Sequence, residues 1–108
     1  MTISFGDFKK LDIRIGTIES VEKIPGADKL LKFVIDLGSE KRQIVAGMAP
    51  WYPDPSVLIG KQLTVLLNLE PRKFMGYESQ GMILAADDGQ NPVFLVPEKT
   101  IAAGSVVR

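Results

Sequence analysis

The chain of 108 residues contains no cysteine and no histidine. The missing cysteine excludes disulfide scaffolds, thiolate zinc sites and cysteine nucleophiles. The missing histidine removes imidazole metal sites, Ser–His triads and histidine acid–base catalysis. The sequence therefore predicts no metal site, no cofactor and no catalysis by this chain alone.

An excess of charge of either sign is absent too. Thirteen Lys and Arg balance thirteen Asp and Glu, and residues 1–60 and 61–108 are each neutral on their own. Nucleic-acid-binding domains are usually basic. Any anion-binding face of this chain must therefore be created by folding, because composition does not supply one.

Long apolar runs are missing as well. No stretch approaches the roughly 18 apolar residues of a membrane helix, and the N-terminus has no apolar run of signal-peptide length. We therefore expect a soluble, cytoplasmic protein without a membrane partner. Its size and ordinary globular composition predict a single domain over residues 1–108.

What the sequence does contain is alternation of apolar and polar residues with the period of a β-strand. The expected strands are residues 12–24, 31–37, 43–48, 63–69 and 79–86, with short late strands at 93–96 and 106–107. Turn residues, mostly Pro and Gly, separate them. Five main strands at this spacing predict an all-β fold built as a small barrel.

Two features qualify this strand pattern. Gly16 and Thr17 interrupt the alternation in the first strand, which predicts a bulge or sharp bend there. Helical signal is limited to short turns, expected within residues 2–10, 27–31 and 54–59, with Thr2 or Ser4 capping the first of them.

The richest stretch for function is residues 68–86. Pro71 should end a strand, Arg72 and Lys73 then lie on an exposed turn that ends at Gly76, and Ser79 begins the next strand. Cations, a hydroxyl and backbone N–H groups converging at a barrel end would suit phosphates and base edges. The alternative is a solvated basic hairpin.

Aromatic side chains near this stretch leave a similar choice open. Phe74 and Tyr77 would either stack on bases or pack back on the barrel. The segment from Gly76 to Gly81 does not match the G-x-S-x-G nucleophile elbow, since Ser79 comes one residue too late.

Several motifs in register, spread over nearly the whole chain, resemble the tRNA-binding domain family. This family includes the C-terminal domain of methionyl-tRNA synthetases and stand-alone tRNA-binding proteins. The matching segments are residues 12–16 (D-x-R-V-G in the family), 27–30 (A-D-K-L), 42–47 (R-x-I-V-S-G) and 68–82 (N-L-x-P-R-K-x-x-G-x-x-S-x-G-M).

The resemblance implies a five-stranded Greek-key barrel of the oligonucleotide/oligosaccharide-binding (OB) type, with short helical turns and extra terminal strands. It also implies a tRNA-facing set of residues. That set is Lys29, Arg42, Asn68, Arg72, Lys73, Ser79, Gln80 and Met82. We expect the four cations to contact phosphates, Asn68, Ser79 and Gln80 to hydrogen-bond sugars or bases, and Met82 to support packing.

Two departures lower the expected positive charge. Ile24 stands where the family often has His, and Met75 where it often has a basic residue. We therefore expect weak, charge-led binding, with a Kd of roughly 10⁻⁶ M at physiological salt.

By this resemblance the chain is an accessory subunit that raises the tRNA affinity of a methionyl-tRNA synthetase catalytic chain. Two alternatives remain open, namely an export chaperone of the CsaA type and an interaction module of a multi-synthetase complex. Family members that stand alone act as homodimers. Exposed apolar residues near both termini, with Val34 and Leu66, would form the interface, or the chain ends would plug the barrel mouths.

Overall fold

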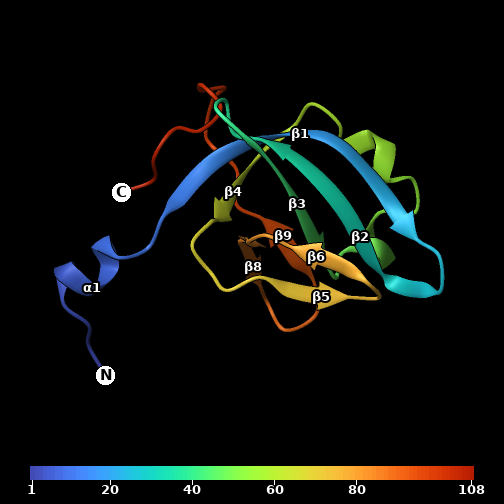
Figure 1. Ribbon diagram of the computed structural model, residues 1–108, viewed down its shortest axis with the longest axis horizontal. Helices are drawn as coiled ribbons and strands as arrows, with labels where there is room; N and C mark the ends of the chain where they lie inside the picture. Colours follow the sequence, from blue (N-terminus) through green and yellow to red (C-terminus); the bar gives the residue numbers. More distant parts are fainter.

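The computed structural model describes all residues, 1–108. Its main feature is an antiparallel sheet of five strands in the order β3-β2-β1-β4-β7 (Figure 1). The elements are α1 (Phe5–Lys9), β1 (Ile13–Ile24), β2 (Ala27–Asp36), β3 (Lys41–Ala46), η1 (Ala49–Trp51), η2 (Pro55–Leu58), β4 (Gln62–Leu66), β5 (Arg72–Phe74), β6 (Tyr77–Ser79), β7 (Met82–Ile83), β8 (Ala85–Asp87) and β9 (Pro92–Phe94).

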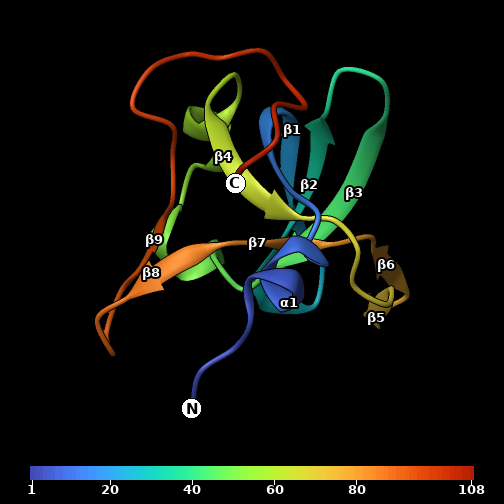
Figure 2. The ribbon, with the colours of Figure 1, turned by 90° about the vertical axis from the view of Figure 1, so that its left-hand side faces the viewer.

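Strand β1 organises the sheet because it pairs with two strands in succession. Its first part, from Ile13 to Thr17, pairs with β4, and its later part, from Thr17 to Ile24, pairs with β2. The strand therefore passes from one neighbour to the other at Thr17. The predicted long, bent first strand is confirmed, and it curls the sheet around its apolar face (Figure 2).

The irregularity in β1 differs in detail from the expectation. The register shifts lie between Ile18 and Ser20 and between Lys23 and Ile24, so the bulge falls just after Gly16 and Thr17. Gly16 has a different role. A Cβ at this position would lie 2.3 Å from Cγ2 of Ile35, so glycine permits the close approach of β2.

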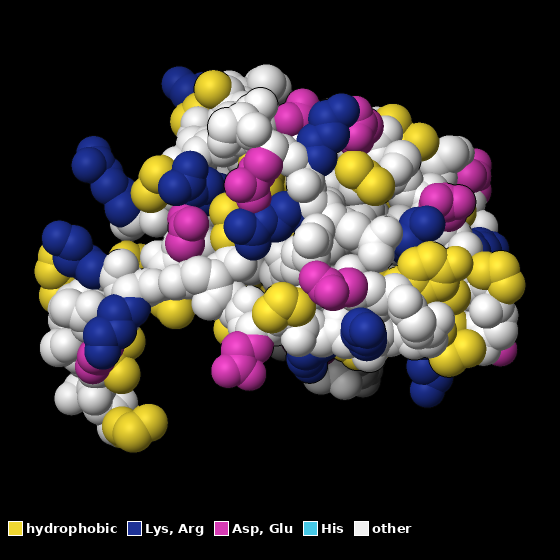
Figure 3. All heavy atoms as spheres, viewed as in Figure 1, with side chains coloured by type: hydrophobic (Ala, Val, Ile, Leu, Met, Phe, Trp, Pro, Cys, Tyr) yellow, Lys and Arg dark blue, Asp and Glu magenta, His cyan; other side chains and the backbone are white.

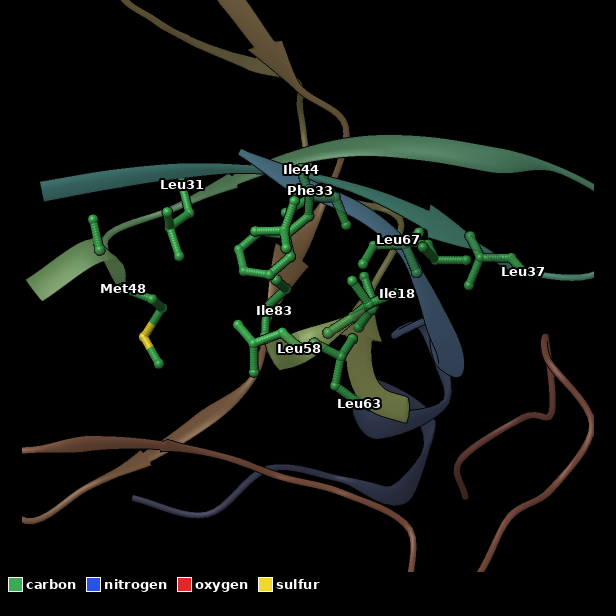
Figure 4. Packing of buried hydrophobic residues seen from close by; sticks show 14 residues of the cluster. Ile18, Leu31, Phe33, Leu37, Ile44, Met48, Leu58, Leu63, Leu67 and Ile83 are labelled. Carbon is green, nitrogen blue, oxygen red and sulfur yellow. The ribbon is translucent and has the colours of Figure 1, made fainter. Parts of the chain in front are cut away.

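The core lies inside the curled sheet. Fourteen buried residues form one cluster, in which Phe33, Ile35 and Ile44 have no exposed surface. Ile18 from β1, Phe33 from β2 and Leu63 from β4 point into the same interior (Figure 4). The period-two pattern of the sequence is thus the pattern of core contacts.

Several shorter elements test the sequence expectations further. Helix α1 begins after Ser4, whose side chain forms a capping box with Asp7, and Asp54 caps η2. The expected helical turn at residues 27–31 is wrong, because Gly26 takes a φ of 81° in a tight turn and β2 starts immediately at Ala27.

The expected strand over residues 79–86 is broken into pieces. Gly81 has a φ of 141°, which interrupts the strand between β6 and β7, and β8 pairs separately with β9. The late strands are confirmed in reduced form, as β9 and as a single bridge between Arg14 and Val106. None of the helices has the length and apolar character that crossing a membrane requires.

The OB-like all-β architecture is confirmed, but hydrogen-bonded strand pairing does not close it into a barrel. The sheet has two edges, β3 and β7, with no ladder between them. Gly81 lies where these edges meet, and a Cβ on it would lie 2.8 Å from the carbonyl oxygen of Leu66.

Gly81→Ala should therefore lower the free energy of unfolding by about 3 kcal/mol, through both the φ of 141° and the clash with Leu66. The control is Gly89→Ala, where φ is 94° but nothing lies within 4 Å, and about 1 kcal/mol is expected. Urea unfolding of both variants measures the difference. Equal losses would show that the contact with Leu66 imposes no constraint.

Candidate nucleic-acid interface

Ser79 serves the fold in this structure. Its side chain is buried at 3% relative exposure, and its Oγ accepts a hydrogen bond from the Val45 N–H at 3.0 Å. The same hydroxyl donates to the carbonyl oxygen of Gly81 at 3.0 Å. The hydroxyl therefore supplies a partner to the open edge of β3 and does not face solvent.

Gln80 continues the same contact along β3. Its backbone N–H donates to the Gln43 carbonyl at 2.8 Å, and its Oε1 accepts from the Gln43 N–H at 3.1 Å. The Nε2 of Gln43 donates in turn to the carbonyl of Glu78. Residues 79–81 thus stand in for the strand that the edge of β3 lacks. We call this contact the β3-edge clasp.

Arg42 is also engaged within the chain. Its Nη1 donates to the carbonyl of Leu67 at 2.7 Å and to that of Gln80 at 3.2 Å, while its Nε donates to Glu40. The guanidinium therefore joins the end of β4 to the β3-edge clasp. In this arrangement Arg42 positions the neighbouring segments. Its guanidinium is already bonded to a carboxylate and to two carbonyls, which weakens its attraction for a phosphate.

Asn68 ties the N-terminal segment to the end of β4. Its Oδ1 accepts from the Asp12 N–H at 2.9 Å, and its Nδ2 donates to the carbonyl of Lys10 at 2.6 Å. The backbone of Leu67 adds a bond to the Asp12 carbonyl. Both ends of the Asn68 amide are thus occupied, and they fix where the chain enters β1.

Arg72, Lys73 and Lys29 are the exposed cations of the predicted set. None of them has a carboxylate within the 4 Å that would make an ion pair. Arg72 and Lys73 are successive residues of β5, so their side chains project from opposite faces of the β5–β6 hairpin. The expected convergence of these two cations is therefore wrong, and Lys73 instead lies opposite Glu78.

Other cations are held by acidic neighbours. Glu19 and Asp12 raise the pKa of Lys41 and of Arg14, in each case first through a hydrogen bond and then through the opposite charge. Basic and acidic side chains are interspersed over the face shown in Figure 3. This face therefore shows no large region of a single charge sign.

The two aromatic residues of the β5–β6 hairpin are half-buried, and a cationic side chain lies over the ring of each. The Arg72 guanidinium lies 5.1 Å from the ring centre of Phe74, and Lys32 lies 4.9 Å from that of Tyr77. Trp51, at 41% exposure, donates its indole N–H to Asn91 at 3.1 Å. Each of the two hairpin aromatics is therefore partly exposed and has a cation over its ring.

An apolar pocket beside this hairpin was not predicted. It has a volume of about 290 Å³, and Arg72 is the one charged residue that lines it. Met82 lines it too, as do Met48, Phe74 and Phe94. The pocket gathers residues from six strands and from the segment after β3. Only the fold brings them together, and no local sequence signal marks them.

Comparison with known protein families identifies the family of this chain. Residues 13–106 match the family described as "Putative tRNA binding domain". The chain belongs to this family. The interpretation drawn from the motifs is thereby confirmed.

Curated relatives of this tRNA-binding domain are much longer proteins. Methionine–tRNA ligase of Methanothrix thermoacetophila is 51% identical over 106 residues, which cover 98% of this chain and 16% of that protein. The enzyme of Archaeoglobus fulgidus is 52% identical over 105 residues, again 16% of its length. The chain therefore corresponds to about one sixth of these ligases, and it is a tRNA-binding domain, not a catalytic one.

Solved structures of similar length share the whole fold. The "MetRS related protein" of Pyrococcus horikoshii superposes with a TM-score of 0.93 at 33% identity and covers 100% of this chain and 99% of its own. The chaperone CsaA of Bacillus anthracis superposes with a TM-score of 0.91 at 28% identity, with complete coverage of both chains. The fold is thus common to proteins named for tRNA ligases and for chaperones.

The β3-edge clasp gives a direct test of Ser79. Ser79→Ala leaves the Val45 N–H and the Gly81 carbonyl without their partner, so the free energy of unfolding should fall by about 2 kcal/mol. The affinity of the folded variant for tRNA should stay unchanged. The control is Ser39→Ala, an exposed serine whose hydroxyl makes no hydrogen bond within the chain. A variant with wild-type stability and weakened tRNA binding would instead make Ser79 a contact residue.

Proposed function

We propose that the chain is a non-catalytic tRNA-binding protein that acts in the cytoplasm as an accessory subunit of methionyl-tRNA synthetase. The match to the tRNA-binding family over residues 13–106 carries this proposal, together with relatives that are methionine–tRNA ligases. Binding tRNA to the accessory chain raises its effective concentration at the catalytic chain without any new chemistry.

The phosphate contacts of this function fall to cations without an internal partner. Lys29, Arg72 and Lys73 are exposed and form no ion pair, whereas Arg42 is bonded to Glu40 and to the carbonyls of Leu67 and Gln80. Three phosphate contacts on a neutral protein give weak binding with a shallow dependence on salt, because the slope of log K against log salt scales with the number of phosphates neutralised. This suits a helper that must release its tRNA.

The chain also presents a surface for a second copy of itself. Helix α1 has no buried residue and lies apart from the sheet at one end of the molecule (Figure 1). A helix of five residues is too short to be stable without packing. Phe5, Phe8 and Leu11 line a mostly apolar hollow of about 310 Å³ against the C-terminal Val106 and Val107, and Lys9 and Arg108 complete its lining.

We therefore propose a homodimer in which this hollow receives the same region of a second chain. An isologous pairing covers Phe5 and Val106, which are 73% and 63% exposed. Leu66, which the sequence suggested for the interface, is instead buried in the chain at 8% exposure. A dimer also doubles the phosphate contacts available to one tRNA.

The structural similarity to CsaA favours a second candidate, an export chaperone that binds unfolded peptides. The TM-score of 0.91 shows that the fold alone does not separate the two functions. The apolar pocket beside Arg72 offers a place for an apolar side chain. Competition between tRNA and an unfolded peptide separates the candidates.

Sedimentation of the wild-type chain at tens of micromolar should show twice the chain mass of 11.8 kDa. Phe5→Asp buries a charge in the proposed interface and should shift the protein to single chains. The control is Val57→Asp, which places the same charge on η2 at a site that is 54% exposed. A wild-type protein that sediments only as single chains would remove the dimer.

Titration of tRNA at several salt concentrations tests the phosphate contacts. Arg72→Gln combined with Lys73→Gln should weaken binding about tenfold and reduce the slope of log K against log salt by about 2. The matched control is Lys61→Gln with Lys99→Gln, which removes two other unpaired cations from the groove around Thr17. An unchanged slope in the first variant, or peptide competition that displaces all tRNA, would contradict the proposal.

A further inference from the structure

The apolar pocket has features that phosphate binding alone does not need. Its volume of about 290 Å³ lies just below the range for ligand pockets, which is roughly 300–1,000 Å³. Phe74 and Phe94 line it from two different hairpins, and the ring of Phe94 is stacked on Tyr52 with the ring centres 5.6 Å apart. This volume holds one group of the size of a base and not an extended ligand.

A single positive charge lies at the pocket. Arg72 lines the pocket, has no carboxylate partner and lies over the ring of Phe74 at 5.1 Å. No acidic residue lines the pocket. Lys73 projects from the other face of the hairpin. The pocket therefore combines an apolar interior with a single uncompensated positive charge.

We propose that this pocket receives the base of one unpaired nucleotide of the bound RNA, while Arg72 contacts an adjacent phosphate. A nucleotide joins a flat π-surface to an anion, which matches the apolar lining and the single positive charge of the pocket. An apolar peptide side chain fits the interior but leaves Arg72 without a partner. The inference rests on the proposed tRNA-binding function and adds which part of the RNA is bound.

The pocket also restricts the kind of RNA. Bases inside an A-form helix are stacked and paired, and their faces are not available to a protein pocket. A base reaches Phe74 only from a loop, a bulge or a single-stranded end. The chain should therefore distinguish RNA with an unpaired nucleotide from a fully paired duplex of equal charge.

The methionines of the chain provide a direct probe. Of its four methionines, Met48 and Met82 line the pocket, whereas Met1 and Met75 do not. In protein labelled with ¹³C at the methionine methyl groups, a short single-stranded RNA should shift the Met48 and Met82 signals through the ring current of the base. The signal of Met1 serves as the internal control and should stay in place, whereas Met75 lies in the turn of the β5–β6 hairpin beside the proposed RNA contacts and is not a control.

Filling the pocket tests the same inference by affinity. Ala85 is exposed and lines the pocket, and its neighbour Ala86 in β8 is exposed and does not. Ala85→Phe should weaken the binding of RNA with unpaired nucleotides about tenfold, the loss expected for one stacked base. Ala86→Phe adds the same ring on the opposite face of β8 and should leave the affinity unchanged.

An abasic oligonucleotide with the same phosphates distinguishes the effect of the base from that of the phosphate charge. It should leave the methyl signals of Met48 and Met82 unshifted. Equal shifts from the abasic strand, or shifts from an unfolded peptide but not from RNA, would overturn the pocket inference. If tRNA binds with a normal salt slope while Ala85→Phe and Ala86→Phe behave alike, only this inference fails. If wild-type protein binds no RNA, the proposed function fails with it.

Discussion

The contact between residues 79–81 and the edge of β3 is the constraint on which the rest of the structure depends. An edge strand exposes N–H and C=O groups that require partners. Here the Ser79 hydroxyl and the Gln80 amide supply them to Val45 and Gln43, although no further strand pairs with β3. Since residue 79 ends β6, the same contact fixes the β5–β6 hairpin, and with it the placement of Arg72 and Phe74.

Much of the fold follows from the sequence because apolar residues of alternating parity form the core. Phe33 and Ile35 mark the buried face of β2, and Leu63 and Val65 join the core from β4, whose other parity, Thr64 and Leu66, is buried as well. Turns were harder to predict. Gly26 allows β2 to begin at once, and the φ of 141° at Gly81 breaks a segment whose composition is typical of a continuous strand.

The site was predicted less well, because a motif does not say whether its residues face solvent or one another. Ser79, Asn68 and Arg42 belong to the motifs, yet their polar groups bind the backbone of Val45, Asp12 and Leu67. The apolar pocket cannot be predicted from any local sequence pattern, because residues such as Met48 and Phe94 come together only in the folded chain. What the motifs encode is largely the frame that presents a few free cations.

The most direct test of this account is a map of tRNA binding on the backbone amides of ¹⁵N-labelled protein. The account predicts that chemical-shift changes concentrate on the β5–β6 hairpin and on residues near Lys29 and Met82. It predicts none around Lys61 and Lys99, whose groove lies elsewhere on the chain. Changes confined to that groove, or no changes at low salt, would contradict a tRNA-binding face built around Arg72.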